Sequence, residues 1–328
     1  MRRLARIAAV AVPLFSFTIA VTYADVKTKT QSNIKFEGFL GFLLNHGKAA
    51  KEGLISTAAV KGNRKATTTE DKGEIIDLGE EKVYTVDYKK KEYSVKTFDQ
   101  IRQEMREQAD KARKEQEKQE PEEKGEPQKP QKEYQVDFDV KDTGQKKQII
   151  GYDTHETIVT VSVHEKGKPI EESGGIVMTS DMWLGPHVPE LKELTDFDMR
   201  YWKALQEGSG VPTMSPEQMA QLLAAFPLVK QAMDRMQKDG DKLSGTPLDT
   251  TMTLESVKSK DQSTQQSQQP SSSGGLGGML ARKMMKKNDS GTGRSTVFTS
   301  RHQYLEIAKS VDAADVAIPA GFKDVTKK

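Results

Sequence analysis

A period-two alternation of apolar and polar residues is the feature that most constrains how this chain can fold. Residues 133–141 show it most regularly, because every even position is apolar and every odd position is polar or charged. The apolar members are Tyr134, Val136, Phe138 and Val140. Alternation of this kind is typical of an antiparallel strand that turns one face toward a core and the other toward solvent.

The same alternation recurs over much of the chain and predicts further strands. The clearest are residues 26–36, 157–163 and 248–257, and weaker patterns cover 53–61, 64–69, 74–78, 147–152, 174–180 and 296–305. Residues 83–87 and 92–97 are expected to pair as a hairpin across a lysine-rich turn. Because short turns join these segments, and not regular helical crossovers, the pattern favours an antiparallel meander over a parallel α/β sheet.

Three segments have a helical period instead. Residues 188–206 and 215–239 each carry an apolar stripe suited to covering one face of a sheet. The remaining one, residues 98–119, is dense in charge and has almost no apolar residue in its second half. We therefore expect this charged helix to project into solvent or to lie over another element.

Two segments have compositions that predict disorder. The charged helix runs into a proline-rich linker that completes the insert 98–132, where nine basic residues between 102 and 132 are balanced by nine acidic ones. Residues 260–294 are rich in Gly, Ser, Gln and Lys, contain no aromatic residue and carry a net charge of +4. We interpret both segments as insertions into a single domain, residues 25–328.

The N-terminal residues have the features of a Sec-type signal peptide. Arg2, Arg3 and Arg6 precede a fifteen-residue apolar stretch, and small residues at the −3 and −1 positions predict cleavage after Ala24. The stretch is short for a membrane-spanning helix, so an uncleaved anchor is the alternative interpretation. No later segment has the sequence of a transmembrane helix. We therefore expect residues 1–24 to be removed, and the mature chain to be periplasmic or secreted and not integral to the membrane.

Composition excludes several classes of protein. The 328 residues include no cysteine, which rules out a disulfide scaffold, a zinc ribbon, an iron–sulfur protein and a thiol enzyme. The 50 Lys and Arg residues nearly balance the 48 Asp and Glu residues, so charge gives no case for a nucleic-acid partner. His155 begins an H-E-x-x-H look-alike, but Val159 stands where the second His is required. We expect no metal and no other cofactor.

Three short segments resemble a known family. Residues 79–98 (GEEKVYTVDYKKKEYSVKTF) are similar to a hairpin of the periplasmic lipoprotein carriers LolA and LolB. With residues 150–152 and 317–323, they look closer still to secreted bacterial proteins of unknown function with the same half-barrel. The resemblance implies a mainly antiparallel β fold with helices (α+β), in which two or three helices cover the concave apolar side of a curved half-barrel sheet. It also implies that acyl chains bind in that hollow, and it brings no catalytic residue.

Two apolar segments that contain glycine are the candidate ligand-binding elements. They are the run 39–44 and residues 276–287 of the late insert, where mobile glycines join large apolar side chains. This combination suits lining or gating an apolar cavity, or touching a membrane surface. The candidate ligand-binding residues are Phe39, Leu40, Phe42, Leu43, Met279, Leu280 and Trp183, and the candidate surface-binding residues are Arg282, Lys283, Lys286 and Lys287. The alternatives are a core element at 39–44 and a disordered tail with incidental apolar residues at 276–287.

Residues 181–189 form a third candidate, because they join Asp181, Trp183 and His187 to two prolines at a predicted strand-to-helix junction. Sites often form at such junctions. The alternative interpretation is a structured corner in which Trp183 fills the core.

These observations leave three hypotheses of function. The leading one is a non-enzymatic envelope protein that binds an apolar ligand, a lipid or the acyl chain of a lipoprotein, in the concave face of its sheet. The alternative is a structural or protein-interaction module that contacts a protein partner through the charged helix 98–119. The third is an unidentified hydrolase that uses Asp181 and His187.

Overall fold

A computed structural model describes residues 25–37, 41, 52–118, 133–207, 209, 230, 234, 238–260 and 293–327. The predicted signal peptide, the proline-rich linker and most of the insert 260–294 lie outside these residues. Most of the predicted helix 215–239 also lies outside them, although its members Lys230 and Asp234 are described and form an ion pair at 2.7 Å.

Twelve strands of the described part form one sheet in the order β12-β6-β5-β4-β3-β2-β1-β11-β10-β9-β8-β7. Neighbouring strands are antiparallel, except that β12 runs parallel to β6. The strands are β1 (Val26–Phe36), β2 (Leu54–Lys61), β3 (Arg64–Thr68), β4 (Lys72–Asp77), β5 (Lys82–Asp87), β6 (Glu92–Thr97), β7 (Tyr134–Ile149), β8 (Tyr152–Glu165), β9 (Gly175–Gly185), β10 (Thr246–Val257), β11 (Arg294–Ala308) and β12 (Lys323–Asp324). The antiparallel sheet that the alternation predicts is therefore confirmed.

Few helices accompany the sheet in the described part. The α-helices are α3 (Phe98–Lys118), α4 (Ile170–Ser173) and α5 (Lys192–Gln206), and short 3₁₀ turns are η1 (Pro189–Leu191), η2 (Gly240–Leu243) and η3 (Ala313–Val316). The helix expected over 188–206 thus begins with a 3₁₀ turn at Pro189, a residue that cannot donate a backbone hydrogen bond. No helix in the described part of the chain is long and apolar enough to cross a membrane.

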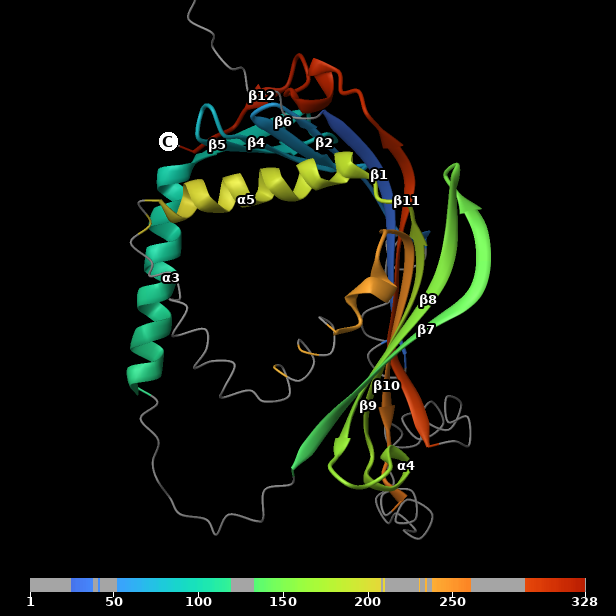
Figure 1. Cartoon of the computed structure of the whole chain (residues 1–328). Helices are drawn as coiled ribbons and strands as arrows, with labels where there is room; N and C mark the ends of the chain where they lie inside the picture. The colour runs from blue at the N-terminus through green and yellow to red at the C-terminus, as the bar shows by residue number, and fades with distance from the viewer. Residues whose placement is uncertain are drawn as a thin grey trace, which may run out of the picture.

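The sheet bends around α5. In Figure 1 strands β1–β6 arch over this helix, and β7–β11 continue the sheet down one side of the molecule. We call the face that α5 covers the inner face and the opposite one the outer face. The core between α5 and the sheet consists of Val26, Val60, Ile76, Val83, Phe98, Phe197 and Leu205.

The outer face of β2–β6 is also covered. The segment after β11 packs there and buries Val311 and Val316 against Ala59, Ala66, Ile75, Tyr84 and Val86, with Ile318 and Phe322 at the margin. Burial on both faces explains why the residues Ile75 and Ile76 are adjacent and both apolar, since a strand that is covered on both sides needs no alternation.

The strand expected over 147–152 is wrong. Ile150 and Gly151 have positive φ values of 44° and 86° and make the tight turn between β7 and β8. The apolar pattern had joined the end of one strand to the beginning of the next. The turn needs left-handed backbone, which glycine adopts freely and which a β-branched residue adopts only at a cost.

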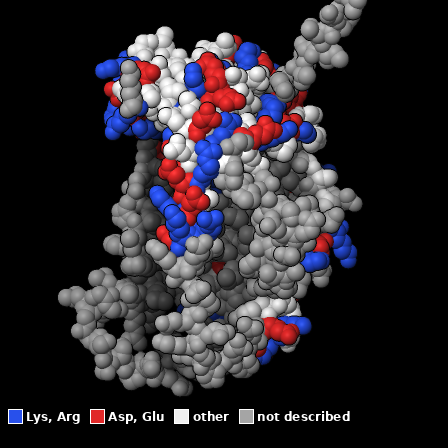
Figure 2. All heavy atoms as spheres, turned by 90° about the vertical axis from the view of Figure 1, so that its left-hand side faces the viewer, with Lys and Arg blue, Asp and Glu red and all other residues white. Residues whose placement is uncertain are grey.

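The first turns of helix α3 pack against the body of the protein. Phe98 is fully buried, Ile101 and Met105 pack beside it, and Arg102 donates a hydrogen bond from Nη2 to the carbonyl of Ala204 in α5 at 2.8 Å. From residue 106 to 115 every side chain is exposed. Figure 2 shows basic and acidic side chains interleaved along this side of the molecule.

Candidate functional site

A row of apolar side chains crosses six neighbouring strands, from β7 to β1. Each member is the direct register partner of the next, so all of them lie on the same face of the sheet. In order across the sheet, the row is Phe138, Val161, Met178, Leu254, Phe298 and Phe36. The rings of Phe36 and Phe298 meet with their centroids 6.0 Å apart.

This row lies on the inner face. Val26 of β1 belongs to the core beneath α5, and β1 pairs with β2 without a register shift over its described partners. Because side chains alternate along a strand, every even residue of β1 from Val26 to Phe36 shares that face. The inner face of the sheet therefore continues from the core under α5 to the apolar row.

Two further rows extend the apolar surface. The next row comprises Val140, Val159, Ser180, Met252, Ser300 and Ile34, and a shorter one on the other side comprises Val136, Val163 and Ile176. Ile34 and Ile176 are 51% and 50% exposed, whereas Val136 and Val159 are buried. We call these three rows the apolar rows. Apolar surface that is left partly open in this way is typical of a binding site.

The outer face of the same strands is more polar, although Ile158 and the buried Val177 also lie on it. The partners there include a row of threonines, Thr160, Thr179, Thr253 and Thr299, between Asp139 and Lys35. The contrast between the two faces explains the alternation seen in the sequence.

A more polar row lies next to the apolar rows on the inner face, on the side toward α5. Its members, which we call the polar row, are Asp142, Thr157, Met182, Thr250, His302, Ser32 and Leu54. Ser32 Oγ and His302 Nδ1 are 2.9 Å apart, and the ring of Tyr304 meets the imidazole edge-on. Thr157 is fully buried, and its hydroxyl has no hydrogen-bond partner in the described structure.

Trp183 lies on the outer face, because it alternates with Met178 and Met182 along β9. Lys147 Nζ stands 3.6 Å from the centroid of its indole, close enough for a cation–π interaction. Trp183 is the one candidate ligand-binding residue that the structure describes, and it is not part of the apolar rows.

Charged residues surround Trp183. Arg301 of β11 donates two hydrogen bonds to the buried carboxylate of Asp249, at 2.9 and 2.7 Å. Burial alone raises the pKa of Asp249, but the hydrogen bonds and charge of Arg301 outweigh it and hold the pKa below the ordinary value. Lys147 adds to this effect from 3.6 Å away.

Asp181 has the opposite balance. Its Oδ1 is buried without a hydrogen-bond partner in the described structure, and the nearby Glu156 is also buried. Burial, followed by the negative charge of Glu156, raises the pKa of Asp181. Glu156 in turn accepts a hydrogen bond from Thr143 Oγ at 2.6 Å.

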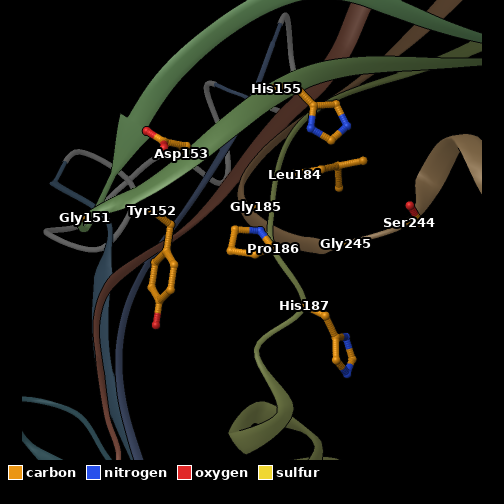
Figure 3. Close-up of a pocket in the computed structure, with 10 residues that line it drawn as sticks. All are labelled: Gly151, Tyr152, Asp153, His155, Leu184, Gly185, Pro186, His187, Ser244 and Gly245. Carbon is orange, nitrogen blue, oxygen red and sulfur yellow. The ribbon is translucent and has the colours of Figure 1, made fainter.

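A separate open pocket of about 860 Å³ lies at the corner between the β7–β8 turn and the end of β9. Figure 3 shows His155 and His187 on its wall, with Leu184 and Pro186 between them. Asp181 is not among its lining residues, so the structure does not bring Asp181 and His187 together there. In the described part of the chain, no group of three or more His, Asp or Glu side chains is arranged to hold a metal ion.

The remaining candidate residues lie outside the described part of the chain. They are Phe39, Leu40, Phe42, Leu43, Met279, Leu280, Arg282, Lys283, Lys286 and Lys287. Sequence reasoning placed the members of the apolar rows in strands but did not join them into one surface. The signal was present in the alternation, and the order in which the strands pair was the missing information.

No protein-family model matches the chain, and no curated protein matches it as a relative.

Proposed function

We propose that this chain is a non-enzymatic envelope protein, periplasmic or secreted, that binds an apolar ligand such as a lipid or an acyl chain against the inner face of its curved sheet. The observation that carries the proposal is the continuous row from Phe138 to Phe36, which crosses six strands with apolar partners only. The proposal also includes the fold, a half-barrel related to that of the lipoprotein carriers.

The apolar rows suit a flexible hydrocarbon chain better than a rigid ligand. Apart from Ser180 and Ser300, their residues are aliphatic, aromatic and thioether side chains that differ in shape, and methionines such as Met178 and Met252 adapt to different partners. Each methylene that leaves water contributes about 0.8 kcal/mol, so affinity should rise about fourfold for every carbon added to the ligand.

Displacement of the uncharged fluorescent probe N-phenyl-1-naphthylamine tests the proposal. The purified protein is expected to enhance the fluorescence of the probe, and octanol, decanol and dodecanol should displace it with the chain-length dependence given above. The absence of probe binding, or an affinity independent of chain length, would contradict the proposal.

A pair of matched variants locates the site. Leu254→Asn places an amide within the central apolar row, whereas Thr253→Asn changes the adjacent residue, which faces outward. Leu254→Asn should weaken probe binding at least tenfold and Thr253→Asn should leave it unchanged. If Leu254→Asn does not fold by circular dichroism, Met178→Gln in the same row serves in its place. Equal effects of inner and outer variants would argue against the inner face.

The exposed part of α3 supports the alternative function, contact with a protein partner. Its side chains from 106 to 115 are all exposed, and basic and acidic residues are mixed along the helix (Figure 2). Reversing charge with Lys111→Glu and Lys114→Glu should abolish binding to such a partner without affecting probe binding. If chemical cross-linking in the envelope gives the same products for the wild type and for this variant, the alternative is wrong.

A further inference from the structure

We propose that the polar row recognises the head of the ligand, and that this head is an uncharged oxygen group of the glycerol-ester type. This inference rests on the proposed function, because it concerns the polar end of the same ligand whose apolar end binds the apolar rows. The site consists of Thr157, Thr250, His302 and Ser32, which occupy one row on the inner face.

The hydroxyl of Thr157 is the observation that points to a ligand. The residue is 0% exposed, and no group in the described structure makes a hydrogen bond with its Oγ1. A buried hydroxyl without a partner costs free energy, so native proteins rarely contain one without a reason. A ligand oxygen that accepts a hydrogen bond from Thr157 would remove this cost.

The neighbours of Thr157 extend the polar patch. Thr250 lies one strand beyond Met182 in the same row, and His302 follows it on β11. Ser32, on β1, is within hydrogen-bond distance of the imidazole at 2.9 Å and so fixes its orientation. Two threonine hydroxyls and a held imidazole can each donate to or accept from the oxygens of a hydroxyl or an ester.

The charges around the row favour an uncharged head over an anionic one. The row contains no Lys or Arg, and its only carboxylate, Asp142, is exposed beside Thr157 and would repel an anion. Lys147 and Arg301 are engaged with Asp249 on the outer face. Lys146, the partner of His155, is exposed on the inner face beyond Asp142, outside the row. An ester or hydroxyl can be satisfied by hydrogen bonds alone, whereas a carboxylate bound at Thr157 would meet the negative charge of Asp142.

The spacing of the rows fits a molecule with a polar head and an apolar tail. From the polar row to the row of Phe138 and Phe36 is four residues along each strand, or about 13 Å. A saturated chain that begins at Thr157 would therefore run across the two nearer apolar rows.

Displacement of N-phenyl-1-naphthylamine by two ligands with the same twelve-carbon chain tests the inference. Monolauroylglycerol carries the uncharged head, and laurate at pH 8 carries the anionic one. The wild-type protein should bind monolauroylglycerol more tightly than laurate. Thr157→Val, which keeps the shape and removes the hydroxyl, should weaken monolauroylglycerol about fivefold and leave the affinity for the probe unchanged.

Thr160→Val is the matched control, because Thr160 lies on the same strand and faces outward. It should change neither the affinity for monolauroylglycerol nor that for the probe. If Thr157→Val fails to fold, Thr250→Val provides a second variant of the polar row. Tighter binding of laurate, or an unchanged affinity of Thr157→Val for monolauroylglycerol, would overturn this inference. Probe binding would still support the proposed function in that case. Failure of both ligands and of the probe would instead remove the proposed function itself.

Discussion

Asp249 on β10 and Arg301 on β11 form a bidentate ion pair, in which Nε and Nη2 of the arginine donate to the two carboxylate oxygens at 2.9 and 2.7 Å. The two partners differ in environment, since the side chain of Asp249 is 8% exposed and that of Arg301 is 53% exposed. The arginine therefore serves mainly to satisfy a buried carboxylate.

Removing the arginine should destabilise the fold. We expect Arg301→Gln to lower the free energy of unfolding by about 1–2 kcal/mol, less than for a fully buried pair because solvent screens the guanidinium. The folded-state pKa of Asp249 is lowered, so its contribution is present above the ordinary carboxyl pKa and is lost as pH falls through the lowered value. Urea unfolding at pH 7 and at pH 3 measures the difference, which should be smaller at pH 3 than at pH 7. A cost that is the same at both values would show that the pair is not its source.

His164 should give the opposite dependence on pH. It is 6% exposed on β8, and its Nε2 lies 2.6 Å from a carboxylate oxygen of Asp137 on β7. The hydrogen bond with Asp137 outweighs burial and raises the pKa of His164 above 6.5. Because the folded-state pKa is raised, the stabilisation is complete below about pH 6.5 and is lost as pH rises through the raised value.

The variant His164→Gln isolates this effect. Its stability should be lower than that of the wild type by about 1 kcal/mol at pH 5.5 and nearly equal to it at pH 9. Thermal unfolding across this range measures it. Thr160→Val, which changes a non-titrating residue on the same strand, is the control. A comparable pH dependence of its stability relative to the wild type would mean that the change at His164 is not specific.

Replacing Asp181 should stabilise the protein at neutral pH. The pKa of Asp181 is raised, so the folded state holds its proton more tightly than the unfolded chain does, and stability falls as pH rises from about 4 through the raised value. Asp181→Asn cannot ionise and should be about 1 kcal/mol more stable than the wild type at pH 7, with no gain at pH 3. Denaturant titrations at the two pH values decide this, and a loss of stability at pH 7 would mean that the carboxylate has a partner that only the charge can satisfy.

The alternation of residues predicted most strands, because a strand that is covered on one face has apolar residues on that face and polar residues on the other, at alternate positions. It joined the end of β7 to the beginning of β8 at Ile150, because an apolar residue in a tight turn resembles one in a strand. It also gave no indication that the segment after β11 would cover the outer face of β4, where Ile75 and Ile76 are both buried.

The candidate site was less predictable than the fold, because it depends on which strands are neighbours. Phe36 and Phe298 are far apart in the sequence and meet only because β1 pairs with β11. Lys147, Trp183 and Asp249 likewise come from three strands, and nothing in their local sequences relates them. A tryptophan at a strand end could have faced either way, and its outward orientation follows from the register of β9.

Phe98 should be the residue that holds α3 to the body of the protein. It is fully buried between the sheet and α5, with its ring 5.3 Å from that of Tyr201, and it is the first residue of the helix. Phe98→Ala should lower the free energy of unfolding by about 3–4 kcal/mol, because it leaves a cavity where the helix begins. Lys111→Ala, in the exposed part of the same helix, should change it by less than about 0.5 kcal/mol. Limited proteolysis should cut α3 faster in Phe98→Ala only, and equal rates in the two variants would mean that other contacts anchor the helix.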